Sequence, residues 1–148
     1  MYLLDTNILS VTAPTKTQPD HELQAWLRRN SAHLFLSVVT LLELNHGLTW
    51  LKHRKATDKA ARLETWIDLI CSYYQSRILP VDAAIALRSG GLITLARAAG
   101  NRIDTEDAII AATADLHSLI VLTGNVRHFA PTGIAHLNPF TGLPPDAS

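Results

Sequence analysis

The sequence predicts an α/β fold in which a mostly parallel sheet is covered by helices on both faces. Short apolar runs alternate along the chain with longer segments whose apolar residues recur every three or four positions. This alternation is typical of strand-helix units, which pair their strands in parallel. The chain has 148 residues, of which 47% are apolar and 18% charged, so it can build the core that such a fold needs.

The N-terminal part of the chain is expected to form two strands with helices between them. The apolar run at residues 2–4 predicts the first strand, and the capping residue types after it predict a helical turn at 8–11. Two prolines in residues 13–19 predict a loop. Apolar residues spaced three and four apart then predict a helix that ends near Asn30, and residues 33–37 form the second strand.

The middle of the chain is expected to be mainly helical. Leucines on one stripe predict an amphipathic helix over residues 38–51, and another helix follows at about 57–74. A third short strand is expected within residues 77–81. A capping aspartate then precedes a helix over 83–99, which a pair of glycines weakens and Gly100 terminates.

The C-terminal part is expected to add one helix and two strands. Three acidic residues introduce a very apolar helix at 108–116, and β-branched residues and leucines predict a strand at 118–122. A final short strand is expected at 134–137. We interpret residues 1–140 as a single domain and the proline-rich residues 141–148 as a poorly ordered tail.

Composition narrows the possible functions. Thirteen basic and thirteen acidic residues cancel, so any contact with nucleic acid depends on a local patch or on a bound metal. Cys71 is the only cysteine, which excludes an internal disulfide and a thiolate cluster for zinc or iron–sulfur. No signal peptide pattern is present, and no apolar run approaches the roughly 20 residues that span a bilayer. We expect a soluble cytoplasmic protein with no membrane partner.

Polar residues stand where a parallel sheet of this kind collects its ligands. Asp5 and Asn125 directly follow predicted strands, Glu43 lies in the helix after a strand, and Asp107 begins an apolar helix. Because ligands bind beyond the carboxyl ends of such strands, we expect the four side chains to converge. Each acid alone has a structural alternative: Asp5 as a helix cap, Glu43 as an ion-pair partner or an exposed side chain, and Asp107 as a complement to the helix dipole.

Carboxylates brought together in this way require positive charge. Two or three of them within about 4–6 Å raise one another's pKa and destabilise the fold unless a cation neutralises them. Ligation by oxygen alone selects Mg²⁺ or Mn²⁺ over zinc. Such an ion activates water and polarises a phosphodiester, so the expected chemistry is phosphodiester hydrolysis.

Four segments carry recognisable motifs: LLDTNIL at residues 3–9, SVVTLLEL at 37–44, DAIIAATA at 107–114 and VLTGNVRHF at 121–129. In order and spacing they resemble the PIN-domain ribonucleases, most closely the VapC and FitB-like toxins of type II toxin–antitoxin systems. The similarity extends to about Phe140. It implies a PIN-like three-layer sandwich and an Mg²⁺- or Mn²⁺-dependent endoribonuclease acting on RNA. It also implies a homodimer and a cognate antitoxin that inhibits the enzyme.

The resemblance also implies the roles of individual residues. Asp5, Glu43 and Asp107 become the metal ligands that hold an activated water. Asn125 occupies the fourth catalytic position, where the family pattern has an acid, so the choice between one and two metals stays open. Asp104 or Glu106 could restore the negative charge that Asn125 does not supply. Residues expected to orient the ligands or a phosphate are Thr6, Asn7, Asp104, Thr123 and Arg127.

Several features have two interpretations. Residues 52–55, with Lys59 and Arg62, form the densest basic stretch, which either guides RNA or is a solvated helix end. His128 is either a general base or structural, and the three tryptophans suit a core or a dimer interface better than base stacking.

Two other functions stay open. One is a PIN module that binds a partner without catalysis. The other is an aspartyl-phosphate phosphatase of the haloacid dehalogenase type, in which a second aspartate would stand at Asn7.

Overall fold

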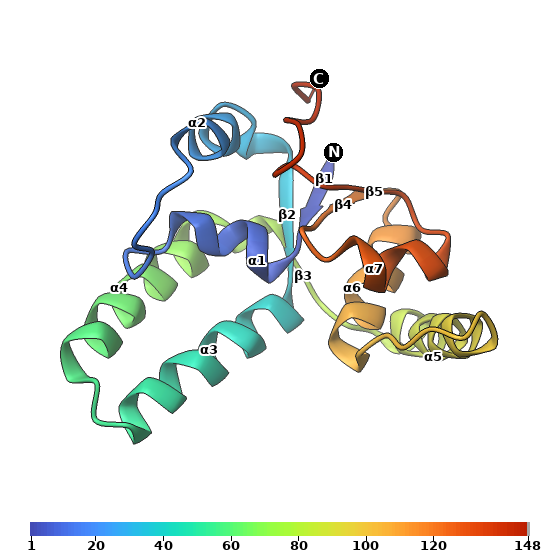
Figure 1. Cartoon of the computed structure of the whole chain (residues 1–148), viewed down its shortest axis with the longest axis horizontal. Coiled ribbons are helices and arrows are strands. Elements are labelled where there is room, and N and C mark those ends of the chain that lie inside the picture. The colour runs from blue at the N-terminus through green and yellow to red at the C-terminus, as the bar shows by residue number, and fades with distance from the viewer. Residues whose placement is uncertain (148) are drawn as a thin grey trace.

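A computed structural model describes residues 1–147, which form five parallel strands and the helices around them (Figure 1). The strand order in the sheet is β3-β2-β1-β4-β5. The strands are β1 Tyr2–Leu4, β2 Leu34–Ser37, β3 Ile78–Leu79, β4 Ile120–Leu122 and β5 His136–Leu137. The α-helices are α1 Thr6–Leu9, α2 His21–Arg29, α3 Val38–His53, α4 Thr57–Tyr73, α5 Ala83–Ala98, α6 Thr105–Leu116 and α7 Val126–Phe129. The 3₁₀ helices are Ser10–Thr12, Ser31–His33, Gln75–Arg77 and Ala130–Thr132.

The sheet separates two apolar cores, because consecutive strand residues point to opposite faces. In β1, Tyr2 and Leu4 pack into a core with residues of α1, α2, α3 and α4. Leu3 points the other way, into a core with residues of α5, α6 and α7. Figure 1 shows the same division, with α1 to α4 on one side of the strands and α5 to α7 on the other. This arrangement confirms the predicted three-layer α/β sandwich.

The predicted elements are confirmed, with differences at their ends. Strand β1 has the predicted bounds, whereas the other four strands are shorter than expected, and β3 and β5 have two residues each. Gly90 and Gly91 do not interrupt α5, and an added Cβ at either would meet nothing within 4 Å. The helix ends as expected: Gly100 has a φ of +75°, and the Asn101 amide donates to the Ala96 carbonyl over 2.9 Å. The short helix α7 was not predicted, because four residues show no periodicity.

The last described residues lie against β1 and the end of α2. The Tyr2 hydroxyl donates to the Pro145 carbonyl over 3.0 Å. The Asn30 side chain donates to Asp146 over 2.8 Å and accepts from the Ala147 amide over 2.6 Å. The division into a domain of residues 1–140 and a poorly ordered tail stays a prediction. Within residues 1–147, no helix is long and apolar enough to cross a membrane.

Candidate active site

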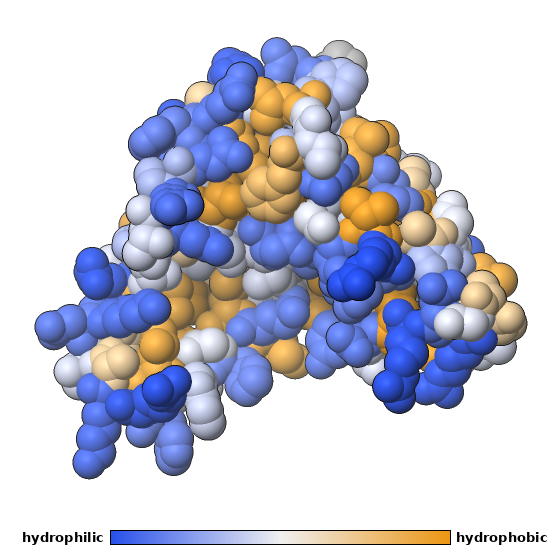
Figure 2. Space-filling model, viewed as in Figure 1, coloured by the Kyte–Doolittle hydropathy of each residue, from blue (hydrophilic) through white to orange (hydrophobic). Residues whose placement is uncertain are grey.

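An acidic hollow of about 590 Å³ opens beside the carboxyl end of β1, between α3 and α6. In the space-filling view the surface is indented between the α3–α4 side and the α5–α6 side (Figure 2). The lining side chains are Asp5, Thr6, Asn7, Ser10, Lys16, Leu42, Glu43, His46, Asp104, Glu106, Asp107 and Asn125. All three predicted metal ligands are therefore brought to one place, together with Asn125 at the fourth predicted catalytic position.

Asp5 is held at the end of β1 by hydrogen bonds to both carboxylate oxygens. Oδ1 accepts from the Thr6 amide over 2.7 Å and so caps α1. Oδ2 accepts from the Asn7 side chain over 2.6 Å and from the Thr123 hydroxyl over 2.7 Å. Burial raises the pKa of Asp5, although these hydrogen bonds act in the opposite direction. Asp5 is thus both the helix cap and a member of the acidic cluster, which were separate interpretations of the sequence.

The loop after β4 is tied to the same residues. The Asn7 side chain accepts from the Gly124 amide over 3.0 Å, and Thr123 Oγ1 accepts from the Asn125 amide over 2.8 Å. A Cβ on Gly124 would lie 2.8 Å from Phe140 Cε2, closer than side chains approach one another. Glycine therefore allows the loop to pass between Phe140 and α1.

Glu43 reaches the hollow from α3. The Ser37 hydroxyl caps that helix by accepting from the Val39 amide over 3.2 Å. The Thr6 hydroxyl donates a short hydrogen bond to Glu43 Oε2. Burial raises the pKa of Glu43, and the negative charges of Asp5 and Asp107 raise it further. The two acids from the first and second strand-helix units are therefore electrostatically coupled.

Asp107 enters from the first turn of α6 and contacts α7. Its Oδ2 lies 2.5 Å from His128 Nδ1, and the same nitrogen lies 2.7 Å from Asn125 Nδ2. Burial raises the pKa of Asp107, whereas His128 lowers it and Asp104 raises it. Oxygen or nitrogen atoms of Asp104, Asp107 and His128 all lie within 4.8 Å of one another.

This donor set fits a divalent cation. Three carboxylates share the hollow, and burial raises the pKa of each, so the ionised cluster destabilises the fold until positive charge arrives. Lys16 lines the hollow with a cationic side chain, but it is an exposed loop residue, so water weakens its interaction with the carboxylates. Oxygen donors on rigid elements are the ligands that Mg²⁺ and Mn²⁺ prefer.

The remaining predicted orienting residues divide into three groups. Thr6, Asn7 and Asp104 line the hollow. Thr123 is fully buried beneath it and acts on Asp5. Arg127 is exposed on α7 and is not one of the described side chains that line the hollow.

Sequence reasoning missed Ser10, Lys16, Leu42 and His46, which also line the hollow. His46 follows Glu43 by three positions, so the helix pattern around Glu43 contained a signal for it, whereas Leu42, one position before Glu43, had no such signal. Lys16 lies in a loop, where no periodicity indicates direction.

The other singled-out residues lie away from the hollow. Lys52 in the basic stretch pairs with Glu64 of α4 over 2.6 Å, which favours a solvated helix end. Trp26 and Trp66 are buried, as expected for core residues, and Trp50 is 55% exposed.

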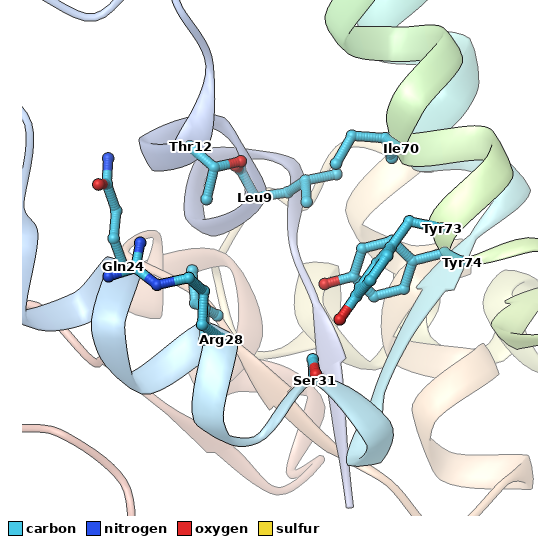
Figure 3. A pocket seen from close by; sticks show the side chains of 9 residues that line it. Leu9, Thr12, Gln24, Arg28, Ser31, Ile70, Tyr73 and Tyr74 are labelled. Atoms are coloured by element: carbon cyan, nitrogen blue, oxygen red, sulfur yellow. The ribbon is translucent and has the colours of Figure 1, made fainter.

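A second cavity of about 270 Å³ lies among α1, α2 and α4 (Figure 3). Tyr73 and Tyr74 face Arg28 across it, and Leu9 and Ile70 close one end. Burial raises the pKa of Tyr74 to about 12, so its hydroxyl stays protonated at neutral pH. No carboxylate lines this second cavity. Of the two cavities, only the acidic hollow therefore has side chains suited to bind a metal ion.

Comparisons with known proteins agree with this geometry. The family model described as "PIN domain" matches residues 2–133. The chain is 34% identical to the protein "Toxin FitB" of Neisseria gonorrhoeae over 95% of this chain and 99% of that one. It is 31% identical to "VapC ribonuclease Y4jK" of Sinorhizobium fredii over 95% of this chain and 98% of that one.

Solved structures show the same fold. The crystal structure of FitAcB from N. gonorrhoeae superposes with a TM-score of 0.79 at 33% identity, covering 95% of this chain and 99% of that one. A toxin–antitoxin complex from Klebsiella pneumoniae superposes with a TM-score of 0.61 at 26% identity, covering 94% of this chain and 98% of that one.

Proposed function

Because the chain belongs to the PIN-domain family, we propose that it is a metal-dependent endoribonuclease toxin that a cognate antitoxin inhibits. The observation that carries this proposal is the convergence of Asp5, Glu43 and Asp107 on one open hollow, each with a raised pKa. Relatives named as a toxin and as a ribonuclease, similar over nearly their whole length, support the activity.

We assign Asp5, Glu43 and Asp107 as the ligands of Mg²⁺ or Mn²⁺. When bound, the ion supplies Lewis-acid polarisation of the phosphodiester and lowers the pKa of an attacking water. The protein's own contribution is positioning. Hydrogen bonds from Thr6 and Thr123 hold Glu43 and Asp5 in fixed orientations, so the carboxylates need not reorganise when charge arrives.

The side chains around the acids are suited to an RNA strand. The hollow is open to solvent, and Lys16 stands at its rim on an exposed loop. Since the chain has no net charge, binding of a polyanion depends on such local groups and on the ion. We assign Lys16 to the phosphate backbone of the substrate.

Exposed apolar side chains on two helices support the proposal that this chain binds other proteins. On α4, Leu69 is 63% and Tyr73 58% exposed, and Tyr73 also lines the cavity of Figure 3. On α5, Leu87 is 80% and Leu95 50% exposed. Leu69 and Tyr73 are four positions apart on α4 and so share one helix face, and contiguous apolar surface of this kind marks contacts with other proteins. We propose that an antitoxin and a second copy of the chain cover them, in line with the named toxin–antitoxin neighbour.

The test is cleavage of RNA by the purified chain, free of antitoxin. A mixed pool of structured RNAs is incubated with Mg²⁺ or Mn²⁺, with chelator, and with the Asp5→Asn variant. Asp68→Asn serves as the matched control, because Asp68 is an exposed acid on α4 outside the hollow. We expect cleavage by the wild type and the control only when metal is present.

Three other outcomes would contradict the proposal. Cleavage that survives both chelator and Asp5→Asn would exclude the metal-carboxylate mechanism. No cleavage of any RNA would favour a binding module, and hydrolysis of a small phosphomonoester would favour a phosphatase.

A further inference from the structure

One ring nitrogen on α7 has two polar partners within hydrogen-bond distance. His128 Nδ1 lies 2.5 Å from Asp107 Oδ2 and 2.7 Å from Asn125 Nδ2. An imidazole nitrogen either donates its one hydrogen or accepts into its one lone pair, so it satisfies one of these partners and not both. His128 is half-buried, with its side chain 28% exposed. The ring nitrogen therefore faces Asp107 and Asn125 with one of these two contacts left unsatisfied.

The His128 ring also belongs to a group of side chains that could hold a metal ion. Asp104, Asp107 and His128 offer donor atoms that lie within 4.8 Å of one another. Asn125, in the position where the family pattern has an acid, supplies no charge. The three donors come from the start of α6 and from α7, whereas Glu43 comes from α3.

We infer that Asp104, Asp107 and His128 form a cation site with a nitrogen donor, in which His128 replaces the missing fourth acid. This inference rests on the proposed function, because Asp107 also belongs to the set formed with Asp5 and Glu43. The shared carboxylate makes the two sets neighbours. Asn125 Nδ2 lies 2.7 Å from His128 Nδ1, so coordination of an ion through Nδ1 would replace this contact.

The nitrogen donor has a consequence for the choice of metal. Mg²⁺ prefers oxygen ligands and keeps several waters, whereas the affinity of a site with a nitrogen donor for divalent transition ions rises from Mn²⁺ towards the later ions of the series. A site with two carboxylates and one imidazole therefore favours a transition ion over Mg²⁺, and Mn²⁺, a paramagnetic member of that group, serves as the probe.

His46 provides the internal comparison. It also lines the hollow, from α3, and it is exposed. It is not part of the group formed by Asp104, Asp107 and His128. His46, which lies near the acids without belonging to the group, is thus a matched control for His128.

The test is pulsed electron paramagnetic resonance of the Mn²⁺-loaded chain, which detects a nitrogen atom bound directly to the ion. We expect ¹⁴N modulation in the wild type, its replacement by ¹⁵N couplings after labelling with ¹⁵N-histidine, its loss in His128→Gln and its retention in His46→Gln. Calorimetric titration should show that His128→Gln raises the Kd for Mn²⁺ by about tenfold or more, a loss typical even of residues that only orient ligands. The Kd for Mg²⁺ should change much less.

Each contrary outcome has a defined meaning. Bound Mn²⁺ without nitrogen modulation, or modulation that survives His128→Gln, overturns the inference and leaves the proposed ribonuclease intact. Nitrogen coordination without RNA cleavage supports the site and overturns the proposed function. Absence of Mn²⁺ binding overturns both. If circular dichroism shows that His128→Gln does not fold, Asp104→Asn is used in its place. An unchanged Kd for Mn²⁺ in Asp104→Asn then overturns the inference.

Discussion

The Thr123 hydroxyl donates a 2.7 Å hydrogen bond to Asp5 Oδ2, joining two residues that are 118 positions apart. The bond forms because β1 and β4 are neighbouring parallel strands, with Leu4 opposite Leu122, so the residues after each strand meet. Asp5 is 4% exposed and Thr123 fully buried, so the contact is protected from water.

Removing the Thr123 hydroxyl should impair catalysis more than folding. In Thr123→Val the Asp5 carboxylate loses a donor, and the Asn125 amide loses its acceptor. We expect the rate of RNA cleavage to fall by about 10- to 100-fold and the free energy of unfolding to fall by about 1–2 kcal/mol. Thr123→Ser keeps the hydroxyl and should restore most of the rate. Equal rates for the valine and serine variants would contradict the assigned positioning role.

The stability of the metal-free protein should depend on the charge of Glu43. Burial holds the pKa of Glu43 above its ordinary value of 4.5, so the folded state binds a proton more tightly than the unfolded state does. The stability that this group contributes is present below its ordinary pKa and is lost as the pH rises through the raised pKa. Glu43→Gln cannot ionise and keeps an oxygen acceptor for Thr6.

Without metal, Glu43→Gln should therefore be more stable than the wild type near pH 8, by less than about 1 kcal/mol because the side chain is partly solvated. The difference should vanish at about pH 4, where the wild-type carboxyl is protonated. Urea unfolding at the two pH values measures it. Added Mn²⁺ should stabilise the wild type more than the variant. A variant that is less stable than the metal-free wild type near pH 8 would argue against this electrostatic account.

Gly124 should tolerate no side chain while Phe140 stays in place. The added Cβ of Gly124→Ala meets the Phe140 ring at 2.8 Å, so the loop that bears Thr123 and Asn125 must shift. We expect a loss of about 1–3 kcal/mol in the free energy of unfolding, and slower RNA cleavage. The double variant with Phe140→Ala removes the obstructing ring and should recover activity relative to Gly124→Ala. No recovery would show that the ring is not the obstacle.

Asn30 should anchor the residues that follow Phe140. It is 3% exposed, and its side chain bonds to Asp146, to the Ala147 amide and to the Trp26 carbonyl. Asn30→Ala should lower the free energy of unfolding by about 1–3 kcal/mol. In a chain truncated after Phe140 the same substitution should cost less, because two of its three partners are gone. An identical cost in both backgrounds would mean that the tail contacts contribute nothing.

The fold class could be predicted from the sequence because its signals are local. The apolar runs and the stripe of Leu44 and Leu48 depend on residues near one another in the chain, and the structure confirms them. Helix α7 escaped prediction for the same reason: its four residues are placed by packing of Phe129 rather than by a repeat.

The candidate site could be predicted in outline and not in detail. Asp5 follows β1, Glu43 lies in the helix after β2 and Asp107 lies in the first turn of α6, so the parallel strand-helix arrangement brings them to one edge of the sheet. The contact between His128 and Asp107 depends on how α7 packs on α6, across 21 positions of sequence, and no spacing rule indicates it. The direction of Arg127, which the structure leaves exposed, was equally hidden.

The most direct test of the central claim is the single-turnover rate of cleavage of one defined RNA, followed against Mn²⁺ concentration for the wild type and for Asp5→Asn. We expect a wild-type rate that rises from zero in chelator and saturates with Mn²⁺. We expect a rate that is lower by about a hundredfold or more in Asp5→Asn at every concentration, because a ligand of the ion is removed. A wild-type rate that is independent of Mn²⁺, or equal in the two proteins, would contradict this claim.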